Sequence, residues 1–139
     1  MYNSDFAEYL SDKTGIDFII IDELSEKSTN VFDIATTLIN LYGVDNRELG
    51  KIWGDYLGFA YVDPNATIVK EEYINKLGLN FIKNNKVIPL YKFGRAVTVS
   101  TPDPHNPFMQ DKLEKMLDEI VSLVFCFPFD VEKYLNKVI

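Results

Sequence analysis

The spacing of apolar residues changes at Gly58, and this change constrains the fold more than any other feature of the sequence. Before it, residues 31–42 and 45–58 place apolar side chains three or four positions apart, which is typical of amphipathic helices. Gly43 stands where the first of these helices would end. After Gly58, two short apolar runs between residues 87 and 100 flank a two-residue link, as in a β-hairpin. The sequence therefore predicts a helical region followed by a region that contains a sheet.

We expect a fold of the α+β class. From Phe59 onward the predicted order is strand, helix, strand, strand, helix, strand, helix, which gives a short mixed β-sheet with helices packed on one face. An acidic N-terminal helical subdomain at 1–58 would precede this α+β core domain at 59–139. The acidity supports the division, because the chain up to Asp63 carries 4 basic and 12 acidic residues and the remainder carries 10 and 9. Within the helical part, residues 16–22 are typical of a short buried strand or an extended arm.

Charge and residue counts exclude several classes of function. The formal net charge of −7 and the pI near 4.6 argue against a nucleic-acid binder, because that affinity depends on clustered Lys and Arg. One cysteine, Cys126, and one histidine, His105, leave neither a disulfide nor the usual zinc ligands. No glycine-rich phosphate loop is present, although a pair of carboxylates brought together in space remains open as an alternative. We predict a protein that is not an enzyme and that uses no metal or cofactor.

The sequence also bears on location. Its first residues lack the basic and apolar regions of a signal peptide. The longest apolar stretch, residues 120–129, is too short to span a bilayer. We therefore expect no direct membrane insertion and a cytoplasmic protein, which a partner could recruit to the inner membrane.

Aromatic and basic side chains are the candidates for protein–protein contact. Tyr, Trp and Arg dominate binding hot spots, and basic residues surround the predicted hairpin. We therefore expect Trp53, Tyr56, Lys92 and Arg95 to bind a partner. The alternatives are that the hairpin lysines only protect a solvated sheet edge, and that Trp53 belongs to the core.

Several motifs in residues 49–139 resemble the N-terminal domain of type II secretion and type IV pilus assembly ATPases. The order and spacing of five pieces carry the resemblance. They are Leu57-Gly58-Phe59-Ala60-Tyr61-Val62-Asp63, Asn85-Lys86-Val87-Ile88-Pro89-Leu90, Gly94-Arg95-Ala96-Val97-Thr98-Val99-Ser100, Thr101-Pro102-Asp103-Pro104, and the closing strand and helix at 120–127 and 131–139.

The resemblance implies a non-catalytic docking and regulatory domain. In that family the domain couples the assembly ATPase to a membrane platform protein, so the implied partners are that platform protein, the motor ATPase, or both.

One branch of the family binds cyclic di-GMP through a helical elbow, which makes a nucleotide-binding regulatory module the alternative. Gly43, Val44 and Leu49 fit the second half of that motif, but Ile34 stands at its arginine and Thr36 at its glycine. The resemblance therefore disfavours cyclic di-GMP as a ligand.

Overall fold

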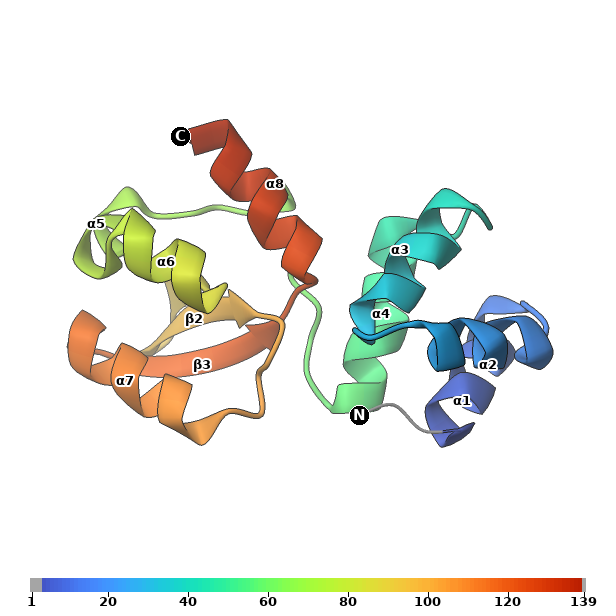
Figure 1. Ribbon diagram of the computed structural model, residues 1–139. Helices are drawn as coiled ribbons and strands as arrows, with labels where there is room; N and C mark the ends of the chain where they lie inside the picture. The colour runs from blue at the N-terminus through green and yellow to red at the C-terminus, as the bar shows by residue number, and fades with distance from the viewer. Residues whose placement is uncertain (1–3, 139) are drawn as a thin grey trace. The chain divides into compact units, whose positions relative to one another are not determined.

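The computed structural model describes residues 4–138, and its contacts divide into two compact units on either side of the Gly58–Phe59 bond (Figure 1). The first unit is helical. It contains α1 (Ser4–Thr14), α2 (Phe18–Lys27), α3 (Phe32–Asn40) and α4 (Asn46–Leu57). The second unit combines helices with a sheet. It contains a 3₁₀ turn η1 (Pro64–Ala66), α5 (Glu71–Leu77), α6 (Leu79–Asn85), β1 (Ile88–Phe93), β2 (Ala96–Thr101), α7 (Pro107–Leu117), β3 (Ile120–Phe125) and α8 (Pro128–Val138).

The first unit is built from two copies of one helix pair. The buried apolar residues of α1 and α2 each have a buried counterpart 28 positions later in α3 and α4. These residues are Phe6, Ala7, Leu10 and Ile21 in the first pair and Ile34, Ala35, Leu38 and Leu49 in the second. Since the same positions face the core in both pairs, the two helix pairs are structural repeats.

The prediction of a strand or arm at residues 16–22 is wrong, because α2 begins at Phe18. Asp17 caps this helix, since its carboxylate accepts a hydrogen bond of 2.9 Å from the Ile19 N–H. The three consecutive isoleucines favour a strand locally, but of these only Ile21 is buried. A helix that buries one isoleucine satisfies the core better than a strand with no neighbour to pair with.

The second unit confirms the α+β prediction. Its sheet has the order β1-β2-β3, with β1 antiparallel to β2 and β2 parallel to β3, so it is mixed. A bulge between Pro89 and Tyr91 interrupts the register of the first pair. One core joins the strands to α5, α6, α7 and α8. Its members on the sheet include Val97, Val99, Val121 and Leu123, and on the helices Leu77, Ile82, Leu113, Leu117, Val131 and Leu135.

The strand expected at residues 59–62 is reduced to a single bridge. Tyr61 pairs in parallel with Phe125, whose N–H donates to the Ala60 carbonyl at 2.8 Å. The Val62 N–H in turn donates to the Phe125 carbonyl at 2.9 Å. This segment therefore adds to the outer edge of β3 only at the strand's last residue.

Within residues 4–138, none of the helices combines the length and the apolar character needed to cross a membrane.

Candidate functional site

A tight elbow joins α3 to α4 and includes two of the three residues predicted to bind a ligand. Gly43 has a φ of 69°, a left-handed conformation that favours glycine, and the Val44 N–H donates to the Leu38 carbonyl at 3.1 Å. Asp45 then caps α4 by accepting a hydrogen bond of 3.0 Å from the Glu48 N–H. The elbow is thus fixed by its own backbone and by one carboxylate.

The elbow between α1 and α2 repeats this arrangement. Gly15 has a φ of 77°, and Asp17 caps the following helix. Two further bonds tighten this first elbow: the Ser11 hydroxyl donates to the Ile16 carbonyl at 2.6 Å, and the Thr14 hydroxyl donates to the Leu10 carbonyl at 2.6 Å. The second elbow has Ile39 and Tyr42 at the positions of Ser11 and Thr14, so it lacks these side-chain bonds.

The second elbow presents an aromatic ring and a cation to solvent. Tyr42 is 45% exposed, Leu41 is 76% exposed, and Arg47 is exposed in the first turn of α4. An aromatic face and a guanidinium beside an open backbone suit a ligand that carries a base and a phosphate. Sequence reasoning did not single out Tyr42 or Arg47. The available signal was an aromatic residue directly before the glycine that ends a helix.

The three residues predicted to bind a ligand differ in accessibility. Gly43 is exposed and Val44 is half-buried, whereas Leu49 is fully buried between the helices. Leu49 therefore shapes the elbow through packing and does not offer its side chain to a ligand.

The residues predicted to bind a partner also differ in their exposure to solvent. Trp53 is only 2% exposed, and its ring lies 4.8 Å from Phe6 and 5.8 Å from Phe32. The expectation of an exposed Trp53 is corrected: it belongs to the helical core. Tyr56 is exposed and packs on Phe6 and Tyr9, with ring centroids 4.6 and 5.0 Å apart.

The other two predicted residues lie at the tip of the β1–β2 hairpin. Lys92 forms an ion pair of 3.0 Å with Glu119, and the hydrogen bond and charge of that carboxylate raise the pKa of Lys92. Arg95 is exposed in the turn. Between them Phe93 is 79% exposed, and sequence reasoning did not select it. The tip therefore carries an exposed aromatic ring and an exposed arginine, while the charge of Lys92 is paired with Glu119.

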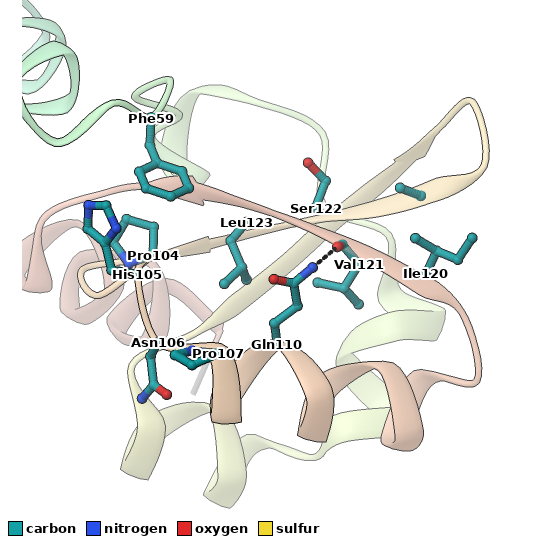
Figure 2. Close-up of a pocket in the computed structure, with 11 residues that line it drawn as sticks. Phe59, Pro104, His105, Asn106, Pro107, Gln110, Ile120, Val121, Ser122 and Leu123 are labelled. Atoms are coloured by element: carbon teal, nitrogen blue, oxygen red, sulfur yellow. Dashed lines mark hydrogen bonds between the residues drawn. The ribbon is translucent and has the colours of Figure 1, made fainter.

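A groove of about 470 Å³ runs along β3 in the second unit (Figure 2). At one end, Gln110 reaches from α7 to the strand, and its side-chain N–H donates to the Val121 carbonyl at 2.9 Å. At the other end, the rings of Phe59 and His105 meet edge to face at 4.8 Å. The sequence gives no local signal for this groove, since its lining comes from four separate segments.

A buried carboxylate, that of Asp130, connects Tyr61 to the start of α8. Asp130 is 3% exposed, and one of its oxygens accepts from the Tyr61 hydroxyl at 2.8 Å and from the Phe127 N–H at 2.9 Å. Burial, and then the neighbouring Asp130 carboxylate, raise the pKa of Tyr61. Burial likewise raises the pKa of the Cys126 thiol. These groups hold the fold together and are not poised for reaction.

The described residues offer no group of three or more His, Cys, Asp or Glu side chains that could hold a metal ion.

Comparison with known proteins gives one family and a similar fold. A family model described as the MshEN domain matches residues 57–138. The solved structure of MshE with cyclic di-GMP is similar in fold, with a TM-score of 0.66 and 14% sequence identity over 99% of each chain. A search of curated proteins finds no match. The expectation that disfavoured cyclic di-GMP is wrong, because a protein with this fold is seen with that ligand. The error came from judging one elbow by two side chains instead of the whole fold.

Proposed function

Because the chain belongs to the MshEN family, whose members are N-terminal domains of GspE-type ATPases, we propose that it is a regulatory domain that binds cyclic di-GMP. The observation that carries the proposal is the likeness to MshE with cyclic di-GMP, which extends over both units. The matched family is the N-terminal domain and not the ATPase domain, which agrees with a regulatory role.

The internal repeat supports this choice of ligand. Cyclic di-GMP consists of two identical halves, each with one guanine and one phosphate. The first unit presents the same glycine-and-aspartate elbow twice, at Gly15 and Gly43. A ligand with two equal halves suits a protein that carries the same glycine-and-aspartate turn twice.

At the second elbow we assign a role to each exposed group. Tyr42 would stack on a guanine, and Arg47 would pair with a phosphate. Ile34, which stands at the arginine of the family motif, is fully buried, so the charge would come from the first turn of α4. Gly43 would let the ligand approach the backbone closely.

Titration calorimetry of the full chain with cyclic di-GMP tests the proposal. We expect saturable binding, and much weaker binding of guanosine monophosphate, which carries only one half of the ligand. Tyr42→Ala should weaken binding roughly five- to 150-fold, since stacking of a base on an aromatic ring contributes about 1–3 kcal/mol. An absence of binding heat with cyclic di-GMP would overturn the proposal.

Two glycine variants distinguish a specific effect at the elbow on ligand binding from a general effect of backbone strain. Gly43→Ala places a side chain at a φ of 69°, and Gly94→Ala does so at 62° in the hairpin turn. Neither added Cβ meets another atom within 4 Å, so both substitutions add backbone strain without a clash. Only Gly43→Ala should reduce binding of cyclic di-GMP. Equal losses in both variants would remove the elbow from the site.

A second proposal concerns partner docking, and the hairpin tip favours it. We infer that Phe93, with Lys92 and Arg95 beside it, contacts a membrane platform protein and so couples the assembly ATPase to it. The domain would then act in the cytoplasm and be recruited to the inner membrane. Tyr56 offers a further contact from the helical unit, and the units 1–58 and 59–139 would act as separate domains.

Surface plasmon resonance with the cytoplasmic part of the platform protein from the same system tests docking. Phe93→Ala and Arg95→Ala should each weaken binding. Phe108→Ala is the matched control, because Phe108 is equally open to solvent but lies on α7. A similar loss from Phe108→Ala, or no binding by the unaltered domain, would contradict the assignment.

A further inference from the structure

The outer edge of β3 is only partly paired. In a parallel ladder, alternate residues direct their N–H and C=O groups toward the neighbouring strand and away from it. β3 pairs with β2 in unbroken register from Ile120 to Phe125. Val121 and Phe125 both bond to groups on the outer side, so Leu123, which lies between them, also directs its N–H and C=O outward.

The outward N–H and C=O groups of Val121, Leu123 and Phe125 differ in their hydrogen-bond partners. At Phe125, the Ala60–Val62 segment of the chain supplies backbone partners. At Val121, side chains of α7 do so: Gln110 donates to the carbonyl at 2.9 Å, and Glu114 accepts from the N–H at 2.9 Å. At Leu123, the hydrogen bonds found among residues 4–138 leave both outward groups unused.

Leu123 is also one of the residues that line the groove of about 470 Å³ (Figure 2). The groove is lined by Phe59, Ala96, Pro104, His105, Asn106, Pro107, Gln110, Ile120, Val121, Ser122 and Leu123. The lining contains no Asp, Glu, Lys or Arg, and the nearby carboxylate of Glu114 is held by the Val121 N–H. The volume falls within the range of ordinary ligand clefts.

We propose that this groove binds an extended, uncharged segment of a partner protein, which adds to β3 as a further strand. Such a segment would use the N–H and C=O of Leu123 and replace the side chains of Gln110 and Glu114 at Val121. These two side chains already place a donor and an acceptor where the backbone of an added strand would place its own.

We argue for an extended strand because the chain already pairs one such segment, Ala60–Val62, with the outer edge of β3. This segment pairs with β3 at Phe125. The groove lies along the same strand, at Leu123 and Val121. The neutral lining favours an apolar or β-branched segment over a charged one. The groove lies entirely in the second unit, whereas the elbows lie in the first.

Amide hydrogen exchange of the full chain, followed residue by residue by NMR, gives the first test. In the unbound protein the Leu123 amide should exchange faster than those of Val121 and Phe125, which are bonded. If the Leu123 amide is instead as protected as its neighbours, the chain's own residues fill the edge and the proposal is overturned.

The second test uses a neutral peptide, acetyl-Gly-Phe-Ala-Tyr-Val-Gly-amide, which copies residues 59–62 that approach this edge. At millimolar peptide, the amide signals of Val121 and Leu123 should shift and their exchange should slow. A version N-methylated at every residue should not bind, because neither of its edges then carries the N–H donors of a strand. Binding that leaves Leu123 unchanged, or no binding, would overturn the proposal.

Variants on α7 provide a control for the competing side chains. Gln110→Ala should tighten peptide binding about two- to tenfold, because the peptide no longer displaces a hydrogen bond to Val121. Asp111→Ala, at the next position and exposed, should leave the affinity unchanged. Weaker or equal binding by the Gln110 variant would show that the peptide does not replace this side chain at Val121, and would overturn the proposal. Binding of cyclic di-GMP should be unaffected by either variant.

Discussion

The buried carboxylate of Asp130 offers the sharpest test of how the second unit is held together. This residue lies in the first turn of α8 and is 3% exposed. One oxygen accepts hydrogen bonds from the Tyr61 hydroxyl and from the Phe127 N–H, which lies just before the helix. It therefore ties the Ala60–Val62 segment to the start of α8. We predict that Asp130→Ala is strongly destabilising.

The magnitude follows from the two bonds. A hydrogen bond to a charged group contributes about 1.5–3 kcal/mol, and Asp130→Ala removes the acceptor of both bonds. Asp130→Ala should therefore lower the free energy of unfolding by about 3–5 kcal/mol. Tyr61→Phe removes only one of the two bonds and should cost about 1.5–3 kcal/mol. In the double variant the two losses should not add, since they share one bond.

The assay must report on the second unit alone. The chain's only tryptophan, Trp53, lies in the first unit, so its fluorescence does not follow the unfolding of the sheet. Hydrogen exchange at slow amides of β2, such as Val99, gives the required free energy in the full chain. Losses from Tyr61→Phe and Asp130→Ala that add within about 0.5 kcal/mol would refute the reasoning, because separate sites add to that accuracy.

Three further predictions concern buried groups. Because the pKa of Tyr61 is raised in the folded state, the tyrosine stays protonated where the unfolded chain ionises, and stability should fall as the pH rises above about 10. This slope should be smaller in Tyr61→Phe but not absent, since the pKa values of Tyr9 and Tyr134 are also raised; equal slopes in urea unfolding would contradict this. Trp53→Ala should lower the stability of the helical unit by about 3–5 kcal/mol, measured by amide exchange at Leu38, and a loss below about 1 kcal/mol would argue against its burial. The Cys126 thiol should resist a disulfide reagent in the folded protein and react fully in denaturant, so rapid labelling without denaturant would show that it is accessible.

The sequence predicted those parts of the fold that a local period can specify. The helices around Gly43 and the hairpin around Gly94 were predicted because each has a run of apolar residues and a glycine at its end. The helix at Phe18 was missed because three β-branched residues outweighed the cap at Asp17. Residues 59–62 have the pattern of a strand, but in the structure only Tyr61 pairs with β3. In these cases the conformation that a segment prefers by its sequence predicted the observed element only where the contacts with the rest of the unit favoured the same element.

The functional residues were harder to predict. The spacing of Leu49, Trp53 and Tyr56 shows that they share one face of a helix, but it does not show which of them the other helices cover. The structure buries the first two and exposes the third. The groove beside Leu123 has no pattern in the sequence, because it depends on which hydrogen-bonding groups of β3 remain without a partner after the chain has folded.

The repeat in the first unit also bears on how such a domain can change over time. A repeated helix pair buries the same set of positions twice, so the exposed residues of one pair can change while the core packing is kept. Here the first elbow is secured by the hydroxyls of Ser11 and Thr14, whereas the second has Ile39 and Tyr42 at the corresponding positions. Selection can then act on the exposed surface of the second elbow with little risk to folding. Duplication thus separates the residues that maintain the domain from those free to acquire new recognition.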